Sequence, residues 1–376
     1  MQKISNFTGL NLKLLLIVIP FLLLVSFIII HENFAFAQTN SPTYNLPQQN
    51  GNGDYLEVIS NTEGNQQVLQ LPISQLLFNV TPQYDQNGKV VSFSLTAKPE
   101  LSDLYNEIGM TNKPKDIVFV YPIFTQAAYS NKGFYDYYNK KCDTSCLTVS
   151  IPTKINGVQA SSIAGALVLR TLGYPHVTDV DVDKNPDILK QYKRVIILHN
   201  EYVTKKEFDA ITSHPDVIYL YPNALYAEVQ TNYNTNTITL INGHGYPDPN
   251  LRNGFGWSSD NSKYEYNVEC DNWNFYKKGN ATMLNCFPEY KMLYSAELLR
   301  ELQKPDPTEL LDEITNWIRY PGQNDTASNM LDNFDIPGTH IPLWVSKPAI
   351  WVTNGEITKS EFGNILRYLY DRNIIK

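Results

Sequence analysis

Positive charge is scarce in this sequence. It holds 30 lysine and arginine residues against 38 aspartate and glutamate residues, and its formal net charge at pH 7 is −8. Downstream of residue 37, lysine and arginine do not form any cluster. Nucleic acids and anionic membrane surfaces are bound mainly through such clusters, so neither is expected to be the main partner of this protein.

Cysteine is also rare, with only four residues in the chain. Cys142 lies close to Cys146 in the sequence, and Cys270 lies close to Cys286. Four cysteines allow three connectivities, and this spacing favours the two local pairs. A four-cysteine metal site is the alternative, but the spacings are not of the Cys-x2-Cys type. The cysteines therefore predict two disulfides and an oxidising compartment.

A long uncharged apolar run occurs near the N-terminus, from Leu14 to Ile30, after Lys3 and Lys13. Ala35-Phe36-Ala37 follows it and has the form of a signal peptidase site. The run is longer than a usual signal core and near the lower limit for a membrane span. It is therefore either a cleaved signal peptide or a retained membrane anchor, and both place the rest of the chain outside the cytoplasm. Sequons compatible with glycosylation begin at Asn79, Asn280 and Asn324.

Residues 193–229 have the pattern of two strands joined by a helix. The apolar runs 195–198 and 217–220 are short and nearly continuous, which is typical of parallel strands covered by helices on both faces. Between them, Thr204 and Glu207 have the spacing of a capping box, in which the two side chains close free backbone N–H groups at a helix start. This stretch predicts a strand–helix–strand unit with parallel strands.

Polar side chains follow both predicted strands. His199 and Glu201 come directly after the first strand, and Asn223 follows the second. The carboxyl ends of neighbouring parallel strands form the edge where open α/β sheets bind ligands. His199 and Glu201 are two positions apart, so in extended chain they point the same way. An imidazole, a carboxylate and an amide are therefore predicted to meet at one edge of a central sheet.

Further strands are predicted at 116–121, 147–151 and 237–241, and a helix at 161–172 that ends at Gly173. Strands that alternate with helices in this way pair in parallel through right-handed crossovers. The predicted organisation is a signal or anchor (1–37), a linker (38–54), a small β subdomain with an Asn87-Gly88 hairpin (55–112), an α/β domain (113–321) with an insertion (252–290), a linker (322–335) and a C-terminal helical module (336–376).

Four segments of the α/β domain form a pattern in order: Leu172-Gly173-Tyr174 at a helix end, an acidic strand at 179–183, His199-Asn200-Glu201-Tyr202 after one strand and Asn223-Ala224-Leu225-Tyr226 after the next. This pattern resembles the large (beta) subunit family of N,N-dimethylformamidase. The family has a tryptophan after each of the last two segments, where this chain has Val203 and Ala227. The resemblance implies a flavodoxin-like fold similar to that of the class I glutamine amidotransferases. It is a parallel sheet flanked by helices, with a small N-terminal β segment and a C-terminal helical hairpin added here.

The resemblance also implies a mononuclear iron site. In that family two tyrosinates and one glutamate hold the iron, and hard oxygen ligands suit a Lewis-acidic ferric ion. By this resemblance Glu201 is the carboxylate ligand, and Tyr129 in Gln126-Ala127-Ala128-Tyr129 is one tyrosinate. His199 takes the acid/base position, Asn223 orients the substrate amide, and Tyr202 is a substrate-binding candidate. An independent substrate-binding candidate is His244, which stands between two glycines at a strand end.

The second tyrosinate has no counterpart in this chain at the family's position. The corresponding segment here is Ser150-Ile151-Pro152-Thr153, which offers no phenol. Tyr121, Tyr135 and Tyr137 are the tyrosines that could take its place in space. The sequence leaves the choice among them open.

Two nucleophile chemistries are excluded by what is absent. Cysteine is missing between Cys146 and Cys270, and the strand end where a glutamine amidotransferase carries its thiol reads Asn223-Ala224 here. The Gly-x-Ser-x-Gly elbow of serine hydrolases is missing as well.

The last forty residues have their own pattern: Ile341-Pro342-Leu343-Trp344, then Asn354-Gly355, and a helix from Thr358 that ends in Ile374-Ile375. This resembles a small helical-hairpin module of archaeal envelope proteins, and it implies an exported protein with an envelope protein as a partner. The pattern carries no catalytic residues.

Two functions are consistent with these observations. The first is an exported or membrane-anchored, metal-dependent hydrolase of a small amide. The second is a catalytically inactive binding or scaffold protein of the cell envelope. In the second, Glu201 is an acidic residue before a helix, His199 a hydrogen-bonded loop residue, Asn223 a turn residue and Tyr129 a packing residue.

Overall fold

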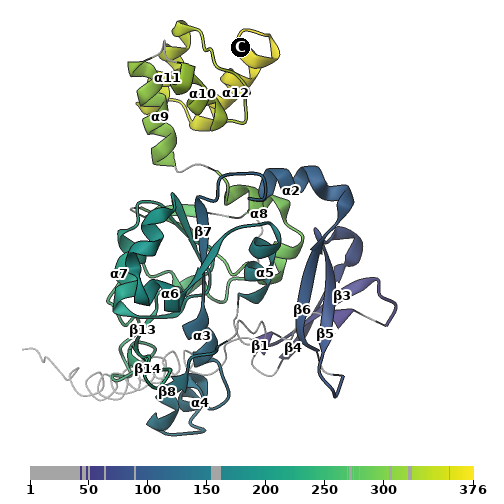
Figure 1. The fold of residues 1–376 in the computed structure, drawn as a ribbon, viewed down its shortest axis with the longest axis vertical. Helices are drawn as coiled ribbons and strands as arrows, with labels where there is room; N and C mark the ends of the chain where they lie inside the picture. The colour runs from purple at the N-terminus through teal and green to yellow at the C-terminus, as the bar shows by residue number, and fades with distance from the viewer. Residues whose placement is uncertain are drawn as a thin grey trace, which may run out of the picture. The chain divides into compact units, whose positions relative to one another are not determined.

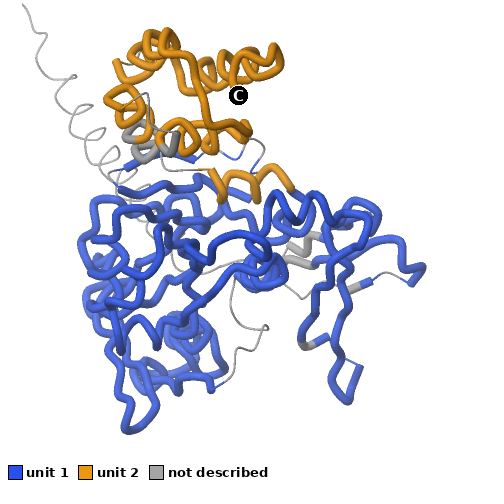
Figure 2. Tube along the Cα trace, turned by 45° about the horizontal axis from the view of Figure 1, so that its top comes forward, with its two compact units in different colours: residues 1–295 blue, residues 296–376 orange. Residues whose placement is uncertain are grey.

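The computed structural model describes residues 43–44, 48–49, 51–62, 65–88, 90–153, 162–268, 270, 273, 275–278, 280–304, 307–320, 324–354 and 356–376. They form two compact units, residues 1–295 and 296–376 (Figure 2). The predicted signal or anchor lies outside the described residues. Within those residues, every helix is too short or too polar to span a bilayer.

The first unit is an α/β fold built on a six-stranded mixed sheet (Figure 1). Its strands, in spatial order, are β15 (Phe275–Lys278), β16 (Ala281–Leu284), β12 (Val217–Tyr219), β10 (Arg194–Ile197), β7 (Ile117–Tyr121) and β9 (His176–Thr178). Strands β16 to β9 all run parallel, and β15 pairs antiparallel with β16. The predicted insertion therefore supplies two strands at one side of the sheet.

Helices cover the sheet because its strands are apolar on both faces. Val118 and Val120 of β7 point to one face, where they share a buried cluster with Val182 and Ile211 of two covering helices. Figure 1 shows α6 and α7 to one side of β7 and α5 to the other. The helices of this unit are α2 (Ser102–Ile108), α3 (Ile123–Ala128), α4 (Phe134–Tyr138), α5 (Ile163–Thr171), α6 (Asp179–Lys184) and α7 (Lys205–Ser213).

Short 3-10 turns connect many of these elements. They are η1 (Ile73–Gln75), η2 (Pro99–Leu101), η3 (Thr144–Leu147), η4 (Pro186–Gln191), η5 (Ser262–Tyr264) and η6 (Glu289–Leu293).

A second sheet takes two strands that the sequence pattern assigned to the parallel sheet. Its order is β11 (Tyr202–Val203), β13 (Ala227–Asn232), β14 (Thr237–Asn242) and β8 (Thr148–Ser150). The predicted strands 147–151 and 237–241 pair antiparallel with each other here. Only residues 233–236 separate β13 from β14, which is too short for a parallel crossover and sufficient for a hairpin. The alternation of strand and helix patterns in the sequence does not by itself distinguish a parallel crossover from a hairpin.

The N-terminal β segment consists of two hairpins. Strands β3 (Tyr55–Thr62) and β4 (Asn65–Pro72) pair antiparallel, with β1 (Thr43–Tyr44) and β2 (Gln48–Gln49) added to β3. Strands β5 (Phe78–Tyr84) and β6 (Val90–Ala97) form the second hairpin. It carries the predicted Asn-Gly turn, in which Gly88 has a φ of +75°. Glycine fits this left-handed conformation because it has no side chain to clash.

Two local predictions around the site are wrong in detail. The acidic segment 179–183 is helix α6, not a strand, and it begins with a complete capping box between Thr178 and Asp181. At α7 only half of the predicted box forms: the Glu207 N–H donates to the Thr204 hydroxyl at 3.2 Å. The Glu207 carboxyl does not reach back, because it is fully buried and interacts with Asp179.

The second unit is helical. It contains α8 (Ala296–Glu301), α9 (Pro307–Arg319), α10 (Asn324–Asp332), η7 (Leu343–Val345), α11 (Ser346–Thr353) and α12 (Lys359–Asp371). Trp317 and Phe362 are fully buried in its core, and Thr358 and Glu361 form the complete capping box of α12. The predicted linker 322–335 carries helix α10, and the unit includes α8 and α9, which the sequence pattern placed with the α/β domain.

Both predicted local disulfides are present, Cys142–Cys146 and Cys270–Cys286. They agree with an oxidising environment for the folded chain.

Candidate functional site

The loops after β10 and β12 lie side by side, as predicted. The Leu225 N–H donates to the Asn200 carbonyl at 2.8 Å, and the Tyr226 N–H donates to the Glu201 carbonyl at 2.9 Å. Because β10 and β12 are parallel neighbours, their carboxyl ends meet at one edge. The backbone bonds between the loops then hold their side chains in a common region.

Three non-glycine residues of this region have left-handed backbone conformations. Their φ angles are +63° at Asn223, +54° at Leu225 and +53° at His244. The Asn223 N–H donates to the Asn261 side-chain oxygen at 3.1 Å, which holds the strained turn in place. Such conformations cost about 1–2 kcal/mol per residue and cluster at functional sites. The loops that carry Asn223, Leu225 and His244 therefore hold local backbone strain, as do several turns elsewhere in the described chain.

Two phenols converge on the Glu201 carboxylate. The Tyr129 hydroxyl lies 3.0 Å from Glu201 Oε2, and the Tyr135 hydroxyl lies 3.1 Å from the same oxygen. The two hydroxyls are 2.9 Å apart, and their rings stack with centroids separated by 4.3 Å. Tyr129 follows α3, Tyr135 lies on α4, and Glu201 follows β10. Three acidic oxygen groups from separate elements thus meet at one point.

An imidazole completes the cluster, and it belongs to His244. Its Nε2 lies 3.5 Å from Glu201 Oε1, and 26% of the side-chain surface is exposed. The ring stacks on Tyr138 with centroids 4.2 Å apart. Burial lowers the pKa of His244 to about 4, so the imidazole is neutral at neutral pH. Glu201 itself is fully buried, whereas Tyr129, Tyr135 and His244 are partly exposed and form the rim above it.

The predicted imidazole, His199, lies beside this cluster. Its ring packs against Tyr129 at a centroid distance of 6.3 Å and against Phe287 at 5.6 Å. Burial lowers the pKa of His199 to about 3, so it is also neutral. Its closest ring partners thus include one of the two phenols that contact Glu201.

Asn223 connects two carboxyl groups. Its amide interacts with Glu201 and with Glu265. Each contact lowers the pKa of the carboxyl group, but burial raises that pKa by more. Glu265 belongs to the predicted insertion and is half-buried; burial raises its pKa to about 7. Asn223 is 2% exposed, and its Oδ1 has no hydrogen-bond partner in the described part of the chain. This oxygen is a buried acceptor that lacks a donor.

The electrostatics of the cluster favour protonated groups. Burial raises the pKa of Glu201 well above its usual range, and the nearby Glu265 charge adds to this rise. Burial, followed by the Glu201 charge, likewise raises the pKa of Tyr129 and Tyr135. A bound cation would reverse these shifts, because it stabilises the deprotonated oxygens.

The donor set matches the chemistry of a hard trivalent ion: two phenol oxygens and one carboxylate, all within 3.3 Å of one another. Among the described residues, no group of three or more histidine, cysteine, aspartate or glutamate side chains could hold a metal ion. A metal site here would therefore depend on the two phenols.

A second buried carboxyl, that of Asp179, hydrogen-bonds two segments of the site. Asp179 Oδ2 accepts the Phe124 N–H at 2.7 Å, and Asp179 Oδ1 accepts the Asn200 amide N–H at 2.5 Å. Phe124 lies on α3, which leads to Tyr129, and Asn200 precedes Glu201. Asp179 therefore ties together the two segments that carry the proposed ligands.

Tyr129 and Asn223 both contact Glu201, and the roles predicted for them stay predictions. Of the three tyrosines left open, Tyr135 is the one that reaches Glu201. Tyr121 instead donates its hydroxyl to Gln126 at 3.3 Å, and the Tyr137 ring packs edge-on against its neighbours.

Tyr202, predicted to bind substrate, is fully buried, and its hydroxyl lies 3.4 Å from that of Tyr138. The residues that sequence reasoning missed are Tyr138, Asn261, Glu265 and Asp179. An aromatic cluster at 134–138 is the one signal that pointed toward Tyr138.

Comparison of the chain with models of known protein families and with characterised proteins finds no match. The interpretation of this site therefore depends on its geometry and on the motif resemblance above.

Proposed function

We propose that this protein is an exported, metal-dependent hydrolase that cleaves the C–N bond of a small amide, with a domain of the glutamine amidotransferase-like type. The observation that supports this most strongly is the meeting of Tyr129, Tyr135 and Glu201 at the carboxyl edge of a parallel sheet. Tyr135 supplies the second phenol for which the sequence had no matching position.

A mononuclear ferric ion is the proposed cofactor. Tyr129, Tyr135 and Glu201 would hold it, since phenolate and carboxylate oxygens are hard ligands. When bound, it supplies Lewis acidity toward the amide carbonyl.

The protein's own groups position the amide and move protons. Asn223 Oδ1 accepts the amide N–H and orients the substrate. The neutral His244 accepts a proton from water as the water oxygen bonds to the carbonyl carbon. The same imidazolium then returns this proton to the departing nitrogen as the C–N bond breaks. His199 packs against Tyr129 and stabilises the position of that phenol.

The test is spectroscopic and catalytic. Protein loaded with Fe(III) is expected to bind one equivalent and to show a visible tyrosinate-to-iron charge-transfer band, together with hydrolysis of simple formamides. Tyr135→Phe should weaken the band and reduce turnover at least tenfold, because one ligand is lost. Tyr137→Phe is the matched control on the same helix and should leave both unchanged. Absence of the band with full-length, folded protein would contradict the proposal.

Export is part of the proposal. The two disulfides agree with an oxidising compartment, and residues 1–37 would act as a cleaved signal or as the membrane anchor.

A specific observation favours the second candidate function, an envelope-binding protein. Helix α11 and the turn before it expose four large apolar side chains, Leu343 (62%), Trp344 (56%), Ile350 (42%) and Trp351 (44%). Exposed tryptophans are typical of protein-binding surfaces. If this function is the relevant one, Trp344→Ser and Trp351→Ser should abolish crosslinking to an envelope protein in intact cells, while Tyr135→Phe should not change it.

A further inference from the structure

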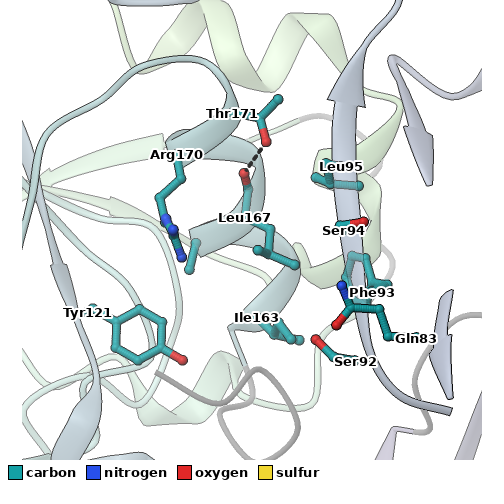
Figure 3. Close-up of a pocket in the computed structure, with 11 residues that line it drawn as sticks. Gln83, Ser92, Phe93, Ser94, Leu95, Tyr121, Ile163, Leu167, Arg170 and Thr171 are labelled. Atoms are coloured by element: carbon teal, nitrogen blue, oxygen red, sulfur yellow. Dashed lines mark hydrogen bonds between the residues drawn. The ribbon is translucent and has the colours of Figure 1, made fainter. Parts of the chain in front are cut away.

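A groove lies in the first unit, between the β5–β6 hairpin and helix α5 (Figure 3). We propose that it is a separate binding site for a small organic monocarboxylate with an apolar body. The groove has a volume of about 410 Å³, which is within the range of small-molecule sites. Its lining shares no residue with the cluster around Glu201, so this inference does not depend on the proposed hydrolase activity.

Arg170 is the charged residue of the groove lining. It lies in the last turn of α5, and Figure 3 shows its side chain directed toward the Tyr121 ring. Among the described residues, no carboxylate forms an ion pair with Arg170. Burial raises the pKa of Tyr121 and lowers the pKa of His176. The positive charge of Arg170 has a smaller effect, which lowers the pKa of both groups. Arg170 is exposed and forms no ion pair with a described carboxylate, so its guanidinium can bind an anion.

Hydroxyl groups stand on both walls of the groove. Ser92 and Ser94 come from β6, and Thr171 comes from the end of α5. The Thr171 hydroxyl donates to the Leu167 carbonyl at 2.8 Å, so its oxygen remains an acceptor. These groups can hydrogen-bond polar substituents of a ligand, while Arg170 binds its charged end.

The remaining lining is apolar. Ile163 and Ala166 are buried on the α5 side, where Leu167 is partly exposed, and Phe93 and Leu95 lie on the β6 side. A ligand that fills the groove must cover this surface, which favours a hydrocarbon body by about 25 cal/mol per Å² of apolar area buried. A fully polar anion would not gain this free energy, because it has no apolar surface to bury.

The single positive charge decides between anion types. A guanidinium and one carboxylate form a matched, two-pronged hydrogen-bonded pair. Inorganic phosphate carries more negative charge than one arginine neutralises, and the groove lining contains no lysine or second arginine. The geometry thus favours a monocarboxylate over a phosphate.

The experiment measures binding to the full chain by isothermal titration calorimetry at fixed ionic strength. The probes are cyclohexanecarboxylate, the isosteric neutral cyclohexanecarboxamide, and inorganic phosphate. The carboxylate is expected to bind at least tenfold more tightly than either of the others, as the loss of a charge-assisted hydrogen bond implies. Arg170→Gln should remove this preference, and Leu167→Trp, which fills the groove, should abolish binding.

Arg319→Gln is the matched control, an exposed arginine in the last turn of α9 in the other unit. It should bind the carboxylate as the parent protein does. The proposal is overturned if the carboxylate and the carboxamide bind equally, if phosphate binds best, or if Arg170→Gln behaves like Arg319→Gln. Because the readout is binding, a failure here is distinct from a failure of the iron site.

Discussion

Glu201 and Glu207 are both fully buried glutamates of the same unit, six positions apart, yet their surroundings differ. Burial raises the pKa of both. Glu201 is surrounded by two phenols, an imidazole and an amide below a partly exposed rim. Glu207 faces Asp179 beneath helix α7, and both of its carboxyl oxygens lack a conventional hydrogen-bond donor in the described chain.

The difference shows that burial alone does not identify a functional carboxylate. Glu207 and Asp179 are neighbouring buried carboxyls, and such neighbours are stable when at least one of them stays protonated. Asp179 of this pair hydrogen-bonds the two segments that carry Tyr129 and Glu201. Glu201 has further oxygen donors aimed at the same point, which is the arrangement that suits a cation. The set of neighbours, rather than the pKa shift, separates the two roles.

The largest expected effect separates the two glutamates directly. Glu201→Gln should lower Fe(III) affinity at least a hundredfold, since an anionic ligand becomes a neutral one. Glu207→Gln should bind iron within a fewfold of the parent protein, because the side chain at position 207 touches none of the proposed ligands. Equilibrium dialysis with iron quantification measures both. Equal loss in the two variants would mean that general stability, not ligation, explains the effect.

The pH dependence of the free energy of unfolding tests the role of the Asp179–Glu207 pair. Burial raises the pKa of Asp179 to about 7, far above its value near 3.9 in an unfolded chain. Between about pH 4 and 7 the folded state therefore holds a proton that the unfolded state has released, so this group's contribution to stability falls as pH rises through that window, by up to about 1.4 kcal/mol per unit. Below pH 4 and above pH 7 the contribution is constant.

Glu207→Gln should remove most of this dependence, because the new amide can donate to an ionised Asp179. In urea unfolding at pH 5 and pH 8, the variant should gain stability relative to the parent protein as pH rises. Asp209→Asn changes an exposed acid on the same helix and should show no such trend. If Glu207→Gln and the parent protein lose stability in parallel with pH, the proton retained by the folded state is not held at Asp179.

The smallest expected effect concerns the two helix starts. Thr204 caps α7 with its hydroxyl alone, whereas Thr358 and Glu361 form both bonds of the box at α12. Thr204→Ala should cost about 1 kcal/mol in the free energy of unfolding, the usual value for a lost cap. Thr358→Ala should cost more within its own unit, since it breaks reciprocal bonds. Thermal denaturation followed by circular dichroism compares the two.

Local patterns predicted much of the chain. The apolar runs around Val195 and Val217 determine buried parallel strands, because continuous β-branched residues suit strands covered on both faces. The disulfides follow from short separations, and the hairpin at Gly88 follows from the left-handed turn that glycine favours. Each of these features depends on interactions within a short length of chain.

The tertiary structure alone decided the composition of the site. Tyr129 and Tyr135 are separated from Glu201 by 72 and 66 residues, so no local spacing links them. Local spacing also does not predict that His244 and Glu265 lie near Glu201, or that the Glu207 carboxyl interacts with Asp179. Sequence determines where strands end and which polar groups follow them. Which groups then touch depends on how helices and loops from distant segments pack over that edge, and periodicity carries no information about such packing.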